Sequence, residues 1–157
     1  MNYSFRKKNK KVKYIVIHYT GMENFKKAIS KLNNLSSDVS CHYLISNSGS
    51  IFNLLCPSLK AWHAGKSQWK NVINLNEYSI GIELENRGHD YGYKSFSRYQ
   101  YSSLKKLINF LIKNFQIQHK NIIFHSDISP NRKKDPGEKF YAYKAGICRF
   151  KNNISYK

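Results

Sequence analysis

The sequence lacks long apolar runs, closely spaced cysteine pairs and, for its size, acidic residues. No segment approaches the ~18 consecutive apolar residues of a transmembrane helix, so no membrane span is expected. The three cysteines, Cys41, Cys56 and Cys148, are odd in number and form no CxxC pair. This pattern argues against a disulfide framework or a zinc finger and favours free thiols. Glycine and proline, 8 and 3 of 157 residues, are too few for a collagen-like or low-complexity chain.

The shortage of acidic residues leaves a strongly positive chain. Lys and Arg number 27 against 9 Asp and Glu, a net charge of +18. Such a field attracts polyanions and anionic substrates without identifying one. A nucleic-acid-binding protein is therefore one hypothesis. However, the sequence contains no recognisable helix-turn-helix, RNP aromatic pair or finger spacing, so no nucleic-acid partner is expected.

The length fits one domain, residues 1–157, with a basic N-terminal segment 1–11 and a short basic C-terminal tail after Ile147. We interpret the basic segment as a solvated face. The apolar run 14–17 that follows it is too short for a signal peptide. This favours the cytoplasm, with a periplasmic or envelope location open if a leader has been removed. The sequence leaves the oligomeric state open, and we favour a monomer.

Hydrophobic periodicity predicts the order of the elements. It indicates a buried strand at 14–17, a short helix capped by Asn24, a hairpin of 41–45 with 51–55, a surface loop at 56–76, an alternating strand at 79–85, and a strand at 121–124. The longest helix follows a capping box, Ser97 with Gln100, and a hydrophobic staple of Phe96 with Tyr101. Mixed hairpin and crossover links predict an α/β fold: a single domain with a central mixed β-sheet flanked by helices.

Two predicted strands each end in a histidine, His18 and His125. The carboxyl ends of strands in open α/β sheets form ligand sites, and catalytic zinc is typically held by three protein ligands. Asp135, followed by Pro136 and Gly137, could complete such a set because these residues restrict the backbone. Spacing alone leaves open that the histidines are hydrogen-bonded polar residues and that Asp135 is a turn residue.

Several other polar residues are candidates with open alternatives. Glu83 follows Gly81 on one face of its strand and could act as a general base, or it could be a solvated edge carboxylate like Glu85 beside it. Trp62 and His63, in the 56–76 loop, could line a substrate groove or pack within the loop. We interpret His42 as a buried hydrogen-bonded residue, and His89 and His119 as surface residues.

The segments IVIHYT, SCHYLI, AWHAG, SIGIELEN and HSDISPNRKKDPG, in this order, resemble the zinc-dependent N-acetylmuramoyl-L-alanine amidases of the type 2 amidase family. That family includes the bacterial AmpD and AmiD enzymes, the phage amidase lysozymes and, more distantly, animal peptidoglycan recognition proteins. The resemblance covers residues 12–140, and the final segment is its most specific part. An aspartate at 135, where the phage lysozymes and recognition proteins have cysteine, is similar to the AmpD and AmiD branch. The short loops are nearer to AmiD.

The resemblance implies that His18, His125 and Asp135 bind one zinc ion, with Glu83 as the catalytic glutamate and Lys133 as the catalytic lysine. Lys134 falls at a variable position. The implied reaction is hydrolysis of the amide between the lactyl group of N-acetylmuramic acid and L-alanine in peptidoglycan or muropeptides. Zinc would activate water for this reaction, and Lys133 would stabilise the oxyanion. A non-catalytic peptidoglycan-binding module is the main alternative. The preference among anhydro-muropeptides, intact wall and lipid-linked precursors stays open.

Overall fold

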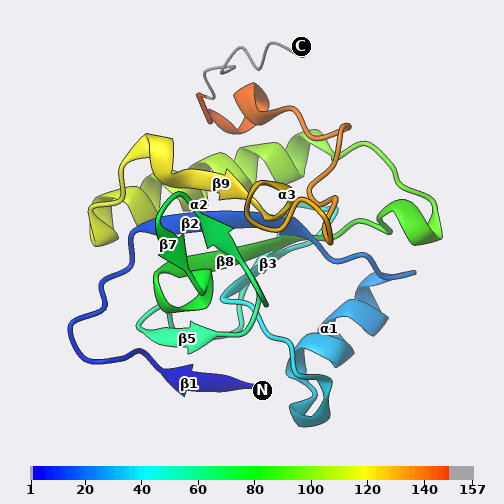
Figure 1. The fold of residues 1–157 in the computed structure, drawn as a ribbon. Helices are drawn as coiled ribbons and strands as arrows, with labels where there is room; N and C mark the ends of the chain where they lie inside the picture. Colours follow the sequence, from blue (N-terminus) through cyan, green and yellow to red (C-terminus); the bar gives the residue numbers. More distant parts are fainter. Residues whose placement is uncertain (1, 149–157) are drawn as a thin grey trace, which may run out of the picture.

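A five-stranded mixed sheet runs through the centre of the computed structural model, which describes residues 2–148 (Figure 1). The strand order is β4-β3-β8-β2-β9, with β4 antiparallel to β3 and the other pairs parallel. The strands are β2 (Tyr14–Tyr19), β3 (Tyr43–Ile45), β4 (Ile51–Asn53), β8 (Ser79–Leu84) and β9 (Ile122–Phe124). The predicted α/β fold with a central mixed sheet is confirmed. The basic tail predicted after Ile147 lies, beyond Cys148, outside the described residues.

Helices cover the two faces of this sheet. The helix α2 (Arg98–Phe115) packs on one face, where its Leu104, Ile108 and Leu111 meet Ile17 of β2 and Ile82 of β8 in the main core. The helix α1 (Phe25–Asn33) packs near β3 and β4 through Leu32, Leu44 and their neighbours. Figure 1 shows α2 and α1 on opposite sides of the sheet. Since side chains alternate along a strand, the residues between those that face α2 point to the other face.

Local signals in the sequence set the helix ends. Asn24 Oδ1 accepts the Lys27 N–H at 2.9 Å and caps α1. The predicted capping box of α2 is present, because Ser97 Oγ accepts from Gln100 N–H at 3.1 Å and Gln100 Oε1 accepts from Ser97 N–H at 3.0 Å. The shorter helical elements are α3 (His125–Ile128) and the 3-10 helices Leu35–Ser37, Leu75–Glu77, His89–Tyr91, His119–Asn121 and Ala142–Ala145.

The segment 56–76 is more ordered than the predicted surface loop. It contains β5 (Leu59–Ala61) and a two-stranded hairpin of β6 (Gln68–Trp69) with β7 (Val72–Ile73). The prediction missed these strands because two of the three have only two residues, and because β5 pairs with a distant partner, β1 (Tyr3–Phe5). Pairing between distant segments leaves no local periodicity.

The basic segment 1–11 is only partly a solvated face. Besides forming β1, it inserts Arg6, whose guanidinium donates to the carbonyls of Pro57 at 3.1 Å, Asn76 at 2.8 Å and Ser79 at 2.8 Å. Burial lowers the pKa of Arg6 to about 10. The segment therefore fastens the amino-terminal end of β8 to the loops around it.

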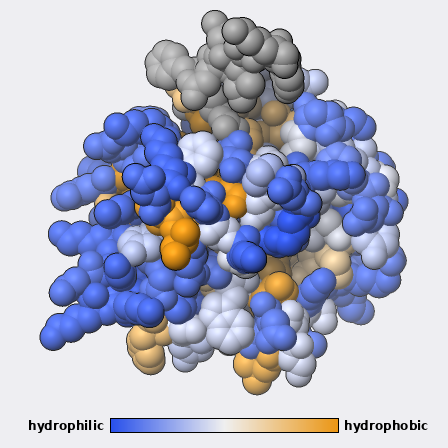
Figure 2. Space-filling model, viewed as in Figure 1, coloured by the Kyte–Doolittle hydropathy of each residue, from blue (hydrophilic) through white to orange (hydrophobic). Residues whose placement is uncertain are grey.

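Polar side chains dominate the molecular surface seen in Figure 2, with apolar residues scattered between them. Exposed large apolar residues such as Phe5, Leu35 and Tyr143 lie on different elements. Single exposed apolar residues are normal on protein surfaces. Within residues 2–148, none of the helices combines the length and hydrophobicity that crossing a bilayer requires.

Candidate metal centre and active site

His18 and Glu83 lie side by side on neighbouring central strands. The register of the parallel pair β2 and β8 places them opposite one another. Their neighbours Ile17 and Ile82 belong to the core against α2, so His18 and Glu83 point to the opposite face. Because β8 lies between β3 and β2, the alternative of Glu83 as a solvated edge residue is wrong.

The loop after β9 brings the other two candidate ligands to the same place. His125 begins α3 directly after β9, and Ser126 N–H donates to the Asp135 carbonyl at 2.9 Å, which closes the loop. Arg132 anchors this loop to the 56–76 segment by donating to the carbonyls of Ala64 at 2.9 Å and Lys66 at 3.1 Å. At Gly137, with φ of 82°, a Cβ would come within 2.6 Å of the Tyr93 hydroxyl, so only glycine fits.

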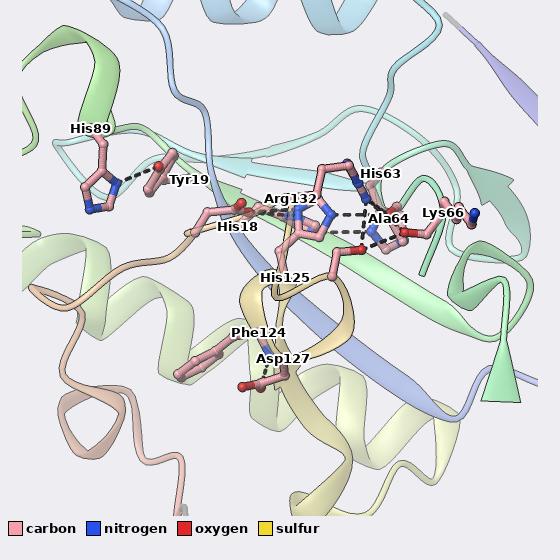
Figure 3. A network of polar contacts seen from close by, with 12 residues as sticks. His18, Tyr19, His63, Ala64, Lys66, His89, Phe124, His125, Asp127 and Arg132 are labelled. Atoms are coloured by element: carbon pink, nitrogen blue, oxygen red, sulfur yellow. Dashed lines mark hydrogen bonds and ion pairs between the residues drawn. The ribbon is translucent and has the colours of Figure 1, made fainter. Parts of the chain in front are cut away.

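Three ligand atoms converge at this point. His18 Nδ1 lies 2.8 Å from His125 Nδ1 and 2.9 Å from Asp135 Oδ2, and His125 Nδ1 lies 3.0 Å from the same oxygen. All three residues are buried. Figure 3 shows His18 and His125 pointing toward one another from β2 and from the start of α3. Among residues 2–148, they form the one group of three with metal-ligand chemistry.

Hydrogen bonds alone do not account for this triangle. If one Nδ1–H donated to the other Nδ1, the accepting nitrogen would face a carboxylate oxygen, which also accepts; if both donated to the carboxylate, two N–H groups would meet. A cation between the three atoms satisfies every contact. Two imidazoles and one carboxylate are also a donor set that catalytic zinc takes, with tetrahedral donors about 3.3 Å apart for zinc-to-ligand distances of about 2.0 Å. The residues therefore fit a zinc ion.

The surroundings of the site shift two pKa values so that His18 is neutral and Asp135 is charged at neutral pH. Burial, with a further contribution from His125, lowers the pKa of His18 to about 4. The contact of His18 with Asp135 therefore involves a neutral imidazole at neutral pH. Burial by itself would raise the pKa of Asp135, but its close contacts with His125 and His18 hold it well below its usual value. Metal ligands need these protonation states, because a lone pair must face the ion.

Glu83 is held in an unfavourable environment. In the described part of the chain, its Oε2 is buried and has no hydrogen-bond partner. Burial, followed by the negative charge of Asp135, raises its pKa well above the usual value. Burying a carboxylate oxygen without a hydrogen bond lowers the stability of the folded state. Carboxyl groups with such a perturbed pKa are typical of functional sites.

A pocket of about 350 Å³ opens over these groups. Glu83 and Lys133 both lie in its wall, together with the three candidate metal ligands. Lys133 is partly exposed, and its backbone N–H donates to the Ser129 carbonyl at 2.9 Å, which continues the turn after α3. Lys134 is exposed and also reaches the pocket rim.

Trp62 and His63 contribute to the pocket wall and also pack within the protein. Each residue therefore combines the two alternatives, lining a groove and packing within the loop. Trp62 is partly exposed and donates its indole N–H to Ser4 Oγ at 2.9 Å. His63 is buried, and its Nδ1 lies 2.9 Å from His18 Nε2. His42 is buried and hydrogen-bonded, as predicted: its Nδ1 accepts the Gly81 N–H at 2.9 Å.

The prediction that His89 is a surface residue is wrong. It is partly buried at the pocket wall, with Nδ1 2.8 Å from the Tyr19 hydroxyl and its ring stacked on Tyr93 at 4.5 Å. Figure 3 shows His89 facing Tyr19. No sequence motif marks His89, and only the fold places it there. His119 is exposed, as predicted.

Comparisons with known proteins agree with the geometry. A family model described as N-acetylmuramoyl-L-alanine amidase matches residues 8–138. The chain is 37% identical over 142 residues to the N-acetylmuramoyl-L-alanine amidase AmiD of Escherichia coli, covering 83% of this chain and 50% of AmiD. It is 40% identical over 103 residues to the 1,6-anhydro-N-acetylmuramyl-L-alanine amidase AmpD of Haemophilus influenzae, covering 65% of this chain and 54% of AmpD.

A solved structure shares the fold. The complex of Escherichia coli AmiD with the substrate anhydro-N-acetylmuramic acid-L-Ala-D-gamma-Glu-L-Lys aligns with a TM-score of 0.78 and 35% identity, covering 86% of this chain and 56% of that one. The chain spans about half the length of the curated relatives it matches.

Proposed function

The chain belongs to the N-acetylmuramoyl-L-alanine amidase family, and from this premise we propose that it hydrolyses the amide between the lactyl group of N-acetylmuramic acid and L-alanine, using one zinc ion. The observation that carries the proposal is the triangle of His18 Nδ1, His125 Nδ1 and Asp135 Oδ2 beside Glu83, whose buried Oε2 has no hydrogen-bond partner within the described residues. A binding module has no need for a buried, destabilising carboxylate next to a metal site.

His18, His125 and Asp135 would hold the zinc ion. Zinc bound by three such ligands supplies a Lewis acid that lowers the pKa of water to about 7 and polarises a carbonyl oxygen. The burial of all three residues keeps bulk water away from the ligand atoms. Asp135 also balances the charge, since its pKa lies well below the usual value and its carboxylate is therefore ionised at neutral pH.

Glu83 is the proposed general base and acid. At Oε2 it would take a proton from the attacking water and then give it to the departing amino group of L-alanine. Its raised pKa suits both tasks, because a stronger base accepts the proton more readily and a carboxyl group with a pKa nearer neutrality returns it. The adjacent positions of Glu83 and His18 across β8 and β2 support this role.

Lys133 is the proposed oxyanion donor. Its ammonium group would stabilise the negative charge that develops on the lactyl carbonyl oxygen. Lys31 and Lys134 also line the pocket, and this positive wall suits the carboxylates of a peptidoglycan stem peptide. Trp62, at the same wall, offers an aromatic surface for the sugar or peptide. We propose muropeptides as the substrate class, as in the AmiD complex.

Purified protein loaded with zinc tests the proposal. It is incubated with anhydro-muropeptide, reducing-end muropeptide and intact peptidoglycan, and free stem peptide is measured by mass spectrometry. We expect the release of peptides with a new amino-terminal L-alanine from at least one substrate, and the relative rates identify the preferred one. A protein with a full zinc site that releases no peptide from any of them would instead be the binding module.

A further inference from the structure

His63 contacts the nitrogen of the His18 ring that does not face the other two proposed metal ligands. Its Nδ1 is 2.9 Å from His18 Nε2, and its Nε2 is 3.1 Å from Ser79 Oγ. Ser79 Oγ in turn donates to the Leu75 carbonyl at 2.5 Å. All four residues are buried. The contacts form one continuous chain from His18 Nε2 to a backbone carbonyl.

The Leu75 carbonyl sets the direction of every hydrogen bond in this chain. A carbonyl oxygen only accepts, so the Ser79 hydroxyl proton points to Leu75 and its oxygen accepts from His63 Nε2–H. A neutral imidazole carries one N–H, so His63 Nδ1 is a bare acceptor and receives His18 Nε2–H. That leaves the lone pair of His18 on Nδ1, the atom that faces His125 and Asp135.

We propose that His63 is a positioning residue that holds His18 in the tautomer able to bind the metal, with Ser79 and Leu75 fixing the direction. The inference rests on the zinc site of the proposed function. Without this chain, His18 Nδ1–H would be free to donate to Asp135, and a protonated Nδ1 is not a ligand. Metal-binding histidines commonly have the second ring nitrogen fixed by such a partner. His125 has its own, because its Nε2–H donates to the Ala64 carbonyl at 3.2 Å.

The strand β8 leaves space for the His63 ring at Gly81. Ser79, Gly81 and Glu83 share the face of β8 that looks away from α2. A Cβ at Gly81 would contact His63 Cγ and lie 2.7 Å from its Nδ1 and 2.8 Å from its Cδ2. One strand face thus supplies the hydrogen-bond acceptor, the space for the ring and the catalytic carboxylate.

Asn76 holds the segment that carries His63. Its Oδ1 accepts the backbone N–H of His63 at 3.1 Å and that of Ala64 at 2.8 Å. The same loop, through the Ala64 carbonyl, fixes His125. The AWHAG segment therefore orients both proposed metal-binding histidines from one hydrogen-bonded stretch of backbone, which explains its role better than a substrate contact by His63 alone.

The test measures zinc affinity by competition with a chromophoric chelator, with His63→Leu, His63→Gln and Ser79→Ala compared with the wild type. Loss of such a partner typically weakens metal binding about 10- to 100-fold. We expect that loss in His63→Leu, a smaller loss in Ser79→Ala, and partial recovery in His63→Gln, whose amide keeps one acceptor and one donor. Gly81→Ala, which displaces the ring without removing a polar group, should also weaken binding.

The second readout is the tautomer itself. In metal-free protein, 15N NMR of the histidine rings should show His18 protonated at Nε2 in the wild type, with protonation shifting to Nδ1 in Ser79→Ala. His42→Gln is the matched control, because His42 is also buried and its ring centroid lies 5.7 Å from that of His63, yet it bonds Gly81 and Leu59 instead of His18. We expect it to keep wild-type zinc affinity.

The outcomes separate the two proposals. If the wild type binds no zinc, the metal-dependent function fails. If the wild type binds zinc and His63→Leu, shown to be folded by circular dichroism, binds it equally well, the positioning role is refuted while the function stands. Equal losses in His42→Gln and His63→Leu would also refute it, because a general effect of burial would then explain both.

Discussion

Glu83→Gln should make the protein more stable and almost inactive. The substitution keeps the shape of the side chain but removes the carboxylate, whose buried Oε2 has no hydrogen-bond partner in the part of the chain that the structure describes. As the proposed general base is lost, turnover should fall about 10²- to 10⁴-fold. Zinc content should stay unchanged, because Glu83 is not among the three ligands.

The stability gain follows from the raised pKa of Glu83. In the unfolded chain its carboxyl group loses a proton near the usual 4.5, whereas the folded protein keeps that proton to higher pH. The ionisation of Glu83 therefore costs no stability below pH 4.5. As pH rises from 4.5 toward the pKa of Glu83 in the folded protein, it lowers the unfolding free energy by at most about 1.4 kcal/mol per pH unit. At about pH 6.5, two units higher, the metal-free wild type should be less stable than Glu83→Gln by up to about 2.7 kcal/mol.

Scanning calorimetry of metal-free wild type and Glu83→Gln at pH 4.5 and 6.5 measures this difference. For a chain of this size, 1 kcal/mol corresponds to about 2–4 °C in Tm, so the gap should grow between the two conditions by at most about 5–10 °C. The matched control is Glu85→Gln, because Glu85 Oε2 accepts the Asn47 N–H at 2.7 Å and lies outside the pocket wall. It should keep activity and gain no stability. A pH-independent gap, or near-normal turnover of Glu83→Gln, would refute the reasoning.

Three further predictions concern the site and its surroundings. Lys133→Ala should lower kcat/KM by about 10²- to 10³-fold in a stem-peptide release assay, since one oxyanion donor is lost, while Lys134→Ala should stay near wild type; equal losses would contradict the assignment. Zinc at 100 times its Kd should raise the unfolding free energy by about 2.7 kcal/mol, and a chelator or Asp135→Ala should abolish that gain in a thermal melt. Burial lowers the pKa of His42 from 6.5 to about 3. Its neutral form therefore costs no stability above pH 6.5, and the unfolding free energy falls as pH drops from 6.5 toward 3. Urea titrations should show His42→Gln reducing this acid loss by up to about 1.4 kcal/mol per pH unit, and an unchanged slope would contradict the neutral buried state.

The sequence by itself determined the elements whose signals are local. The caps at Asn24 and Ser97 and the helical spacing behind them predicted α1 and α2, because capping and amphipathic periodicity act within a few residues of the chain. The strand-end positions of His18 and His125 were also readable, since short apolar runs lead into each. Parallel strands then carry both to one edge of the sheet.

Tertiary structure alone decided the interactions between segments far apart in the chain. β1 and β5 form only because they pair across more than 50 residues, and Arg6 is partly buried only because three distant carbonyls accept its hydrogen bonds. Glu83 has one carboxylate oxygen, Oε2, that is buried without a hydrogen-bond partner among residues 2–148, because β8 lies between two other strands.

The same distinction applies within the candidate site. The sequence placed a glycine at 81 and a serine at 79 on the face of Glu83, but their alternation gave no sign of what would cover them. Packing of the AWHAG segment on that face put the His63 ring over Gly81 and against Ser79. Hydrogen-bond direction depends on which donor meets which acceptor in space, so the tautomer of His18 was fixed only when the fold joined these residues to the Leu75 carbonyl.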